Sequence, residues 1–368
     1  MIQVDGLRTF AVGFVIFSHY TIEIDHLIGF DHYLGQMGVT LFFVISGFLI
    51  TSILIGNKEN QAQSNGHILR QFYIRRFLRI FPLYYFIIFA GFVLSIPECR
   101  EQIFWLLTYI PNWLLKTPSG DLHYFSHLWS LGIEEQYYIV FPAIFLFVSH
   151  KKTPTLFISM IILGIIARIF IIFWGYHTRQ TDQITWVGQR ITFCCLDPFG
   201  IGGLLAFFKF YYSEKTRLFV NQKRLWIAPL MLSMAACILM MLNEKHVFLW
   251  LTGIIFNRLF MALASVWIIA MASYSDFKGI LGKILTNKIV VYLGKISYGI
   301  YVYHYIVPYF FSGVHPFKSV RVVDFLLLRG SYLLTTILIA SISWYLLEKP
   351  INDLKRYFSY SPKKEVLS

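Results

Sequence analysis

The feature that most limits what this chain can fold into is a series of apolar segments, each about 20 residues long. Inside a bilayer every backbone N–H and C=O must find its partner within the segment, so such a segment is expected to cross as an α-helix. The candidates run roughly 7–24, 38–56, 80–97, 128–148, 155–175, 192–209, 225–242, 250–272, 290–311 and 325–347. We therefore expect an all-α polytopic membrane protein with ten transmembrane helices.

The composition supports this class and excludes others. Charged residues make up 14% of the 368 residues, against about 25% in typical soluble proteins, and apolar residues make up 57%. These values exclude disordered, collagen-like and disulfide-scaffold proteins. The net charge of +13 could suit nucleic acid, but the basic residues lie in short runs between apolar segments. That distribution is typical of contact with lipid head groups, so we expect membrane lipids and no nucleic acid as partners.

The cysteines give no sign of a metal site or of a disulfide framework. Cys99, Cys194, Cys195 and Cys237 lack the spacing of metal ligands, and three of them lie in or beside apolar segments. We expect them to be buried apolar side chains.

The basic residues also predict orientation. An eleventh apolar stretch, 102–115, is short and contains Pro111 and Asn112, so we expect it to be re-entrant or interfacial. The loops on one side then carry about three times as many Lys and Arg as those on the other, which places both termini in the cytoplasm. The first segment lacks a cleavage site and is predicted to be a retained helix. We expect one membrane domain over residues 1–358 and a disordered cytoplasmic tail over 359–368.

Ionisable groups inside membrane spans are costly unless they face a partner or water, so each is a functional candidate. Arg8 and His19 are 11 residues apart, which on a helix puts them on one face with a rise of about 16 Å. A groove along this face could hold an anionic carrier at the cytoplasmic mouth and bring its reactive end to the imidazole. Alternatively, Arg8 is an interfacial anchor and His19 is a core histidine.

The start of the fourth span carries a second group of polar residues. His127 and Glu134 are seven residues apart, so they lie on one helix face, with Tyr138 one turn further. We expect at least one of Glu134 and Glu135 to hydrogen-bond an Arg or His; a carboxylate beside His19 would fix its tautomer. The alternative is a structural polar contact between helices.

Three further groups allow both functional and structural interpretations. Arg75, Arg76 and Arg79 suit phosphate oxygens, although a basic helix bound to anionic lipid would look the same. Small residues in the second span allow close approach of a ligand or of another helix; they are Gly35, Gly38, Ser46 and Gly47. Ser297, Tyr301 and His304 form one stripe that could contact a sugar or cross-link helices.

The later arginines and Trp129 are further candidates because of where they lie in or beside the spans. Arg258 lies deepest among the later arginines, ahead of Arg168 and Arg329, and is expected to need a carboxylate partner. Trp129 lies near the outer boundary, where an indole can stack on a sugar ring or belong to an ordinary interfacial belt.

Taken in order, these residues resemble acyltransferase family 3, the bacterial membrane O-acyltransferases of surface glycans. The resemblance runs from Asp5 to Pro350 and rests on five elements: Arg8 with His19, Gly38 to Phe48, Arg76 with Arg79, His127 to Tyr137, and Ser297 to His304. It implies an O-acyltransferase in the bacterial cytoplasmic membrane, with ten helices, acyl-CoA (usually acetyl-CoA) as the cytoplasmic donor and a glycan hydroxyl as the acceptor.

The resemblance also implies roles for single residues. His19 would be catalytic with Arg8 coupled to it, and Arg76 and Arg79 would hold CoA phosphates. We add Glu134 and Glu135 to the catalytic candidates, Arg75, Ser46 and Gly47 to the donor-binding ones, and Trp129, His127, Tyr301 and His304 as acceptor-binding ones.

Two open points accompany the resemblance. Many members carry an extracytoplasmic hydrolase-like domain, which we do not expect here, so transfer is expected either to finish in the membrane domain or to use a separate extracytoplasmic transferase. The rival interpretation is a transporter or lipid-linked sugar flippase without acyl transfer, because ten spans with buried charges also suit alternating access.

Overall fold

The computed structural model describes residues 1–21, 33–60, 63–114, 123–178, 190–241, 247–311 and 322–360. Throughout these ranges the chain folds into helices, and none of the described residues lies in a strand. The predicted all-α class is therefore confirmed. Most of the predicted tail, residues 361–368, lies outside the described residues.

Six helical stretches of the described chain are long and apolar enough to cross a membrane. They are Tyr33–Glu59 (α3), Asn65–Val93 (α4), His150–His177 (with α8, Thr153–His177), Thr192–Tyr211 (with α10, Leu196–Tyr211), Leu251–Ser273 (in α13, Val247–Ser273) and Val322–Tyr357 (with α17, Val322–Ser343). They coincide with six of the ten predicted spans. The total of ten and the cytoplasmic termini stay predictions.

The other four predicted spans take different forms. The helices α1 (Ile2–Tyr20) and α7 (Trp129–Phe147) have 19 residues each, but their polar side chains make them less apolar than the six. A third, α12 (Ile227–Met241), has 15 residues. The fourth, predicted as one helix over 290–311, is broken into α15 (Lys288–Lys295), α16 (Ser297–Tyr303) and a 3₁₀ turn, η6 (Val307–Phe311).

Glycines on both sides of the first break help to explain it. Gly294 and Gly299 each weaken a helix by about 0.5–1 kcal/mol relative to alanine. A Cβ at Gly294 would lie 1.8 Å from the carbonyl oxygen of Asp5, so the glycine lets α15 lie directly against α1. The continuous span predicted for 290–311 is therefore wrong as a single helix.

The stretch 102–115 forms two short helices, α5 (Ile103–Leu107) and α6 (Pro111–Leu114). At 1.5 Å per residue, neither could cross a hydrocarbon core of about 30 Å. Gln136 of α7 holds this segment, because its amide nitrogen donates to the carbonyl oxygen of Tyr109 and to Asn112 Oδ1, both at 2.9 Å.

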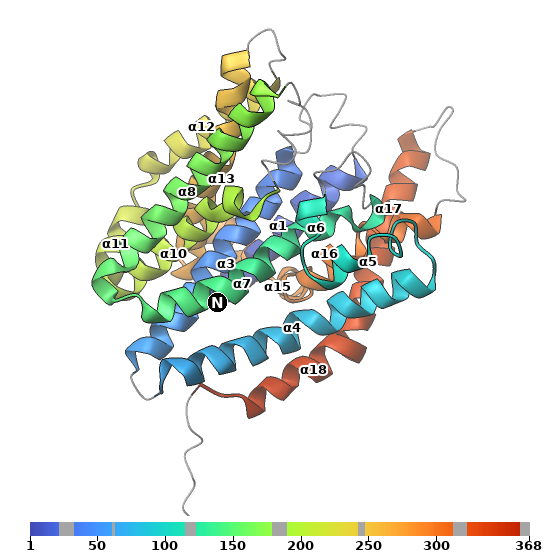
Figure 1. The fold of residues 1–368 in the computed structure, drawn as a ribbon, viewed down its shortest axis with the longest axis horizontal. Helices are drawn as coiled ribbons and strands as arrows, with labels where there is room; N and C mark the ends of the chain where they lie inside the picture. Colours follow the sequence, from blue (N-terminus) through green and yellow to red (C-terminus); the bar gives the residue numbers. More distant parts are fainter. Residues whose placement is uncertain are drawn as a thin grey trace, which may run out of the picture.

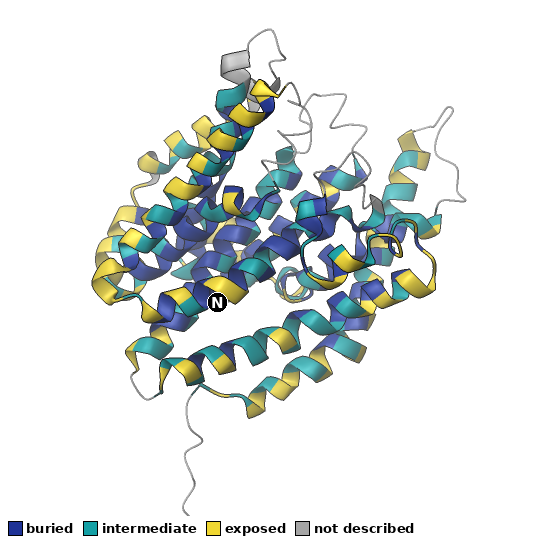
Figure 2. Cartoon of the chain, viewed as in Figure 1, coloured by how far each residue is buried: buried dark blue, intermediate teal, exposed yellow. Residues whose placement is uncertain are grey.

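The helix α3 lies at the centre of the molecule and packs most extensively against α10 and α1 (Figure 1). Glycines permit this contact: a Cβ at Gly202 would lie 2.2 Å from the carbonyl oxygen of Val44, and one at Gly47 would lie 2.3 Å from that of Phe199. Exposed apolar side chains gather on the outer helices such as α8 and α17, as expected of a surface that faces lipid (Figure 2).

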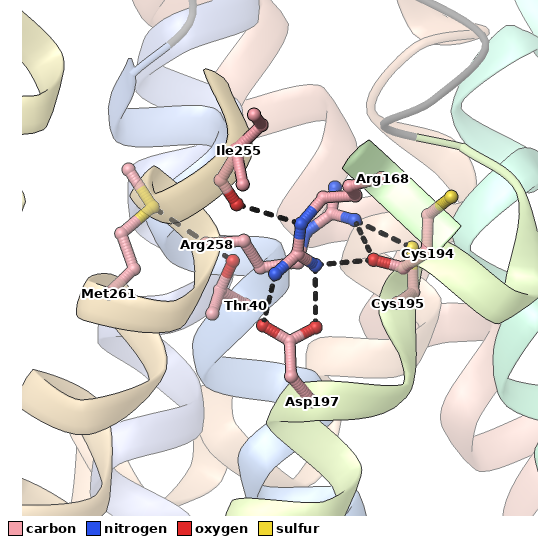
Figure 3. A network of polar contacts seen from close by, with 8 residues as sticks. All are labelled: Thr40, Arg168, Cys194, Cys195, Asp197, Ile255, Arg258 and Met261. Atoms are coloured by element: carbon pink, nitrogen blue, oxygen red, sulfur yellow. Dashed lines mark hydrogen bonds and ion pairs between the residues drawn. The ribbon is translucent and has the colours of Figure 1, made fainter. Parts of the chain in front are cut away.

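A buried charge pair joins α8 to α10 (Figure 3). Arg168 is 1% exposed and donates two hydrogen bonds to the carboxylate of Asp197, at 2.7 and 2.9 Å. Arg258 donates instead to the carbonyl oxygen of Cys194 and to Cys195 Sγ. Arg168 is thus more buried than Arg258, and it is Arg168 that pairs with Asp197, so the expectation that Arg258 rather than Arg168 needs this kind of partner is not met within the described residues.

The cysteine prediction is confirmed for three of the four residues. Cys99, Cys194 and Cys195 are buried, and Cys195 Sγ accepts the hydrogen bond from Arg258 described above. The side chain of Cys237 lies outside the described residues.

Candidate active site

The helix α1 carries both Arg8 and His19, and it packs against α3, α15 and α16. Both side chains are half-buried, so neither is sealed in the core nor open to the surroundings. Along a regular helix the two positions are about 16 Å apart. The site can therefore be described as an arginine end and a histidine end of one helix.

A small cavity lies beside the arginine end. Its volume is about 50 Å³, which is room for a few water molecules or for a group of a few non-hydrogen atoms. Its wall combines apolar and polar side chains, and it is lined by Arg8, Val39, Phe42, Phe43, Ser130, Leu131, Glu134, Ser297, Tyr298 and Tyr301. Ser297 Oγ is buried and has no hydrogen-bond partner within the described residues. It is thus free to bond a group placed in the cavity.

The carboxylate of Glu134 is held at this cavity by two hydroxyl groups. Ser46 Oγ donates to Oε1 at 3.1 Å and Tyr138 donates to Oε2 at 3.0 Å, and the two hydroxyls are 2.8 Å apart. Arg8 and Arg76 act on this carboxylate through space. The prediction that Glu134 or Glu135 accepts a hydrogen bond from an Arg or His is therefore wrong within the described residues, because the hydroxyls of Ser46 in α3 and Tyr138 in α7 donate to Glu134 instead.

Glu135 is turned to another side of α7 and is 4% exposed. Its Oε1 has no hydrogen-bond partner within the described residues. No hydrogen bond joins Glu134 or Glu135 to His19 within the described residues. Their catalytic role stays a prediction.

Three guanidinium groups meet at the arginine end. Arg8 and Arg76 both act on Arg79 through space, and all three are half-buried. The guanidinium of Arg76 lies over the ring of Tyr138 at 5.0 Å. In the described part of the chain no carboxylate forms an ion pair with any of the three. Such an excess of cations can hold an anion with several oxygens.

Arg75, on the same helix, binds the end of the described chain. It donates to the carbonyl oxygens of Lys355 and Phe358, both at 3.0 Å. This contact brings half-buried Lys355, in the turn η8 (Leu354–Tyr357), close enough to Arg76 and Arg79 for their charges to act on it. Sequence reasoning missed Lys355, because only the folded chain brings residue 355 to α4.

The small residues of α3 divide between the cavity and packing. Ser46 lies against Glu134 beside the cavity, as described above. Gly47 faces the backbone of Phe199, so helix packing accounts for this glycine. A role of Gly47 in donor binding stays a prediction.

The histidine end contains three imidazoles from distant parts of the chain. Nδ1 of His19 lies 2.9 Å from Nε2 of His304, and the rings of His127 and His304 meet edge to face at 5.0 Å. His127 Nε2 donates to the carbonyl oxygen of Val302 at 3.0 Å, while its Nδ1 has no partner within the described residues. His127 and His304 are buried.

Tyr301 joins the two ends of the site. Its ring lines the cavity, and its hydroxyl donates to the carbonyl oxygen of His127 at 3.0 Å and lies 2.7 Å from Ser130 Oγ. These bonds cross-link α16 to α7. His19 itself is not among the cavity-lining residues of the described chain, whereas Tyr301 lines the cavity and its ring lies 5.6 Å from that of His127 and 5.3 Å from that of His304.

Trp129 lies outside this arrangement. It is half-buried, meets Phe43 edge to face at 6.4 Å and has the guanidinium of Arg190 over its ring at 5.4 Å. Its binding of a sugar acceptor stays a prediction.

Comparison with known proteins identifies relatives over almost the whole chain. The model of an acyltransferase domain, that of acyltransferase family 3, matches residues 1–347. The O-acetyltransferase OatA of Staphylococcus aureus (strain NCTC 8325 / PS 47) is 28% identical over 394 residues, which cover 98% of this chain and 59% of the relative. The peptidoglycan O-acetyltransferase OatA of Listeria monocytogenes is 28% identical over 390 residues, which cover 97% of this chain and 57% of the relative. The chain thus spans less than two thirds of the length of these relatives, and no solved structure matches it.

Proposed function

This chain belongs to acyltransferase family 3, and on that premise we propose that it is an integral-membrane O-acyltransferase. The donor is acyl-CoA, with acetyl as the acyl group, and the acceptor is a hydroxyl of a cell-surface or secreted glycan. Two relatives named as O-acetyltransferases, one of them a peptidoglycan O-acetyltransferase, support this choice of acyl group and of acceptor class.

One observation carries the proposal: α1 bears Arg8 toward one end, where two arginines of α4 approach it, and His19 toward the other, where two further imidazoles lie, and the two positions are about 16 Å apart. Acyl-CoA has the matching shape, because its phosphates and its thioester lie at opposite ends of a long, thin molecule. Arg8, Arg76 and Arg79 bind the phosphate oxygens, with Lys355 at the edge of the cluster.

At the histidine end His19 acts as general base. It takes the proton of the acceptor hydroxyl as that oxygen attacks the thioester carbonyl, and it returns the proton to the departing CoA thiolate. The hydroxyl of Ser297, which has no partner within the described residues, is the donor available to the oxyanion of the tetrahedral intermediate. In the variant mechanism His19 itself carries the acyl group transiently.

The proposal includes the topology of the chain in the membrane and the sides from which the two substrates enter. The chain crosses the bacterial cytoplasmic membrane ten times with both termini inside, so that the donor enters from the cytoplasm and the acceptor reaches the site from the outer half. A separate extracytoplasmic transferase is one route by which the acyl group continues to the glycan.

Thioester consumption tests the proposal and separates it from the rival transporter. Purified protein in lipid nanodiscs, given acetyl-CoA and a glycan acceptor, should release CoA, detected with a thiol reagent. His19→Ala should reduce release by roughly 10²–10⁴-fold, the usual contribution of a general base. His177→Ala is the matched control, because His177 is an exposed histidine at the end of α8. Wild-type protein that moves a glycan without consuming thioester would be a carrier.

A further inference from the structure

The ring of His304 has a complete set of contacts, yet the proposed reaction gives it no task. It follows α16 directly and is fully buried. Its Nδ1 lies 2.5 Å from the carbonyl oxygen of Tyr301 and its Nε2 lies 2.9 Å from Nδ1 of His19. The hydroxyl of Tyr20 donates to its backbone carbonyl at 2.8 Å. The ring is therefore held at both of its nitrogens, and the backbone of the residue is held by Tyr20.

These contacts determine which nitrogen carries the proton. A carbonyl oxygen only accepts, so His304 Nδ1 must carry the hydrogen that it donates to Tyr301. A neutral imidazole has one N–H, so His304 Nε2 is left as an acceptor. The hydrogen between the two rings then belongs to His19 Nδ1, and the lone pair of His19 lies on Nε2.

The surroundings favour the neutral form of His304. Its neighbours are the rings of His19, Tyr20, His127, Tyr301 and Tyr305. Within the described residues no carboxylate contacts it. A cationic ring here would be a buried charge without a counter-ion, which is costly.

We propose that His304 is a positioning residue that holds His19 in its Nδ1–H tautomer and so presents Nε2 of His19 to the reacting hydroxyl. The inference rests on the proposed role of His19 as base. A carboxylate usually performs this task in catalytic histidine pairs. Here a neutral imidazole performs it, and it becomes a stronger acceptor partner when His19 takes up the proton, because charge-assisted hydrogen bonds are the stronger ones.

The tautomers can be read without any enzymatic assay. Wild-type protein labelled with ¹⁵N-histidine in nanodiscs should show His19 and His304 both protonated at Nδ1, in spectra that correlate ring nitrogens with ring hydrogens. The His19→Gln and His304→Gln proteins assign the two signals by their loss. A His19 ring protonated at Nε2 in the wild type would overturn the proposal.

Kinetics provide the second test. Gln at position 304 reaches as far as Nε2 and can still accept from His19, so His304→Gln should keep kcat within about tenfold, whereas His304→Leu should lower kcat by roughly 10²-fold or more with little change in the KM of acetyl-CoA. Thr336→Val is the matched control, because Thr336 is buried and bonds Tyr20 but not the ring of His304. Equal kcat in the Gln and Leu proteins, or an unchanged kcat in both, would overturn the proposal.

The two tests also separate this inference from the proposed function. If the protein consumes no thioester, the proposed function fails, while the nitrogen spectra still decide whether His304 fixes His19. If thioester is consumed but the tautomer is reversed, only the inference fails. If the Leu protein does not fold, the wild-type spectra remain decisive.

Discussion

At the residue scale, three arginines form the end of the site where we propose that the phosphates of the donor bind. Arg8, Arg76 and Arg79 act on one another through space, and no described carboxylate forms an ion pair with them. Like charges at close range repel unless an anion joins them. We therefore expect phosphate binding here rather than helix packing alone.

Replacing Arg76 and Arg79 together by Ala should raise the KM of acetyl-CoA by roughly 10²-fold or more, because each charge-assisted hydrogen bond contributes about 1.5–3 kcal/mol. The kcat at saturating donor should change much less. Steady-state kinetics in nanodiscs measure both. Arg70→Ala is the matched control, since Arg70 is exposed on the same helix. Unchanged kinetics in the double variant would leave these arginines as lipid anchors.

The buried pair Arg168–Asp197 contributes stability rather than chemistry. Asp197→Ala would leave a guanidinium buried without its partner, and we expect a loss of about 3–5 kcal/mol. Asp276→Ala is the control, because its partner Arg217 is 47% exposed and solvent-exposed ion pairs contribute little to stability. Thermal unfolding of both variants in detergent measures the difference. Equal melting temperatures would contradict this account of the pair.

At the scale of elements, glycines decide how closely the central helices pack. Gly202→Ala should destabilise the protein by about 1–3 kcal/mol, because the new Cβ would lie 2.2 Å from a backbone oxygen of α3. Gly56→Ala, with open space around the position, should be neutral or stabilising by up to about 1 kcal/mol. Thermal unfolding distinguishes them, and a reversed order would show that α3 and α10 do not pack as described.

The sequence predicted elements better than it predicted contacts. Apolar length located the spans of α3, α8, α10, α13 and α17, since lipid requires about 20 apolar residues. The prediction of one continuous helix failed at 290–311. There Gly294 packs directly against α1, and the hydroxyl of Tyr301 hydrogen-bonds the chain at the start of α7, so the helix is interrupted.

In the candidate site, too, contacts within one helix were predictable and contacts between distant segments were not. Spacing on one helix correctly grouped Tyr138 with Glu134, which are hydrogen-bonded in the structure. The pairing of His19 with His304 and the approach of Lys355 to α4 join residues more than 270 positions apart. No local pattern reports such contacts, because they depend on which helices are neighbours.

At the scale of the whole molecule, the distribution of Lys and Arg predicts sidedness. A cysteine at Lys215, in the exposed helix α11 (Ser213–Val220), should face the cytoplasm, and one at Thr178, at the end of α8, should face outward. A membrane-impermeant maleimide added to intact spheroplasts should label Thr178→Cys, and should label Lys215→Cys only after permeabilisation. The opposite pattern would invert the topology and place the arginine end outside.

The central claim is that one imidazole, His19, is needed for acyl transfer to a glycan. The most direct measurement is the mass of the surface glycan from cells that carry the wild-type chain, the His19→Ala chain or the His177→Ala chain at equal membrane levels. The account predicts acetyl increments with the wild-type and His177→Ala chains and none with the His19→Ala chain. Full acetylation with the His19→Ala chain would contradict it.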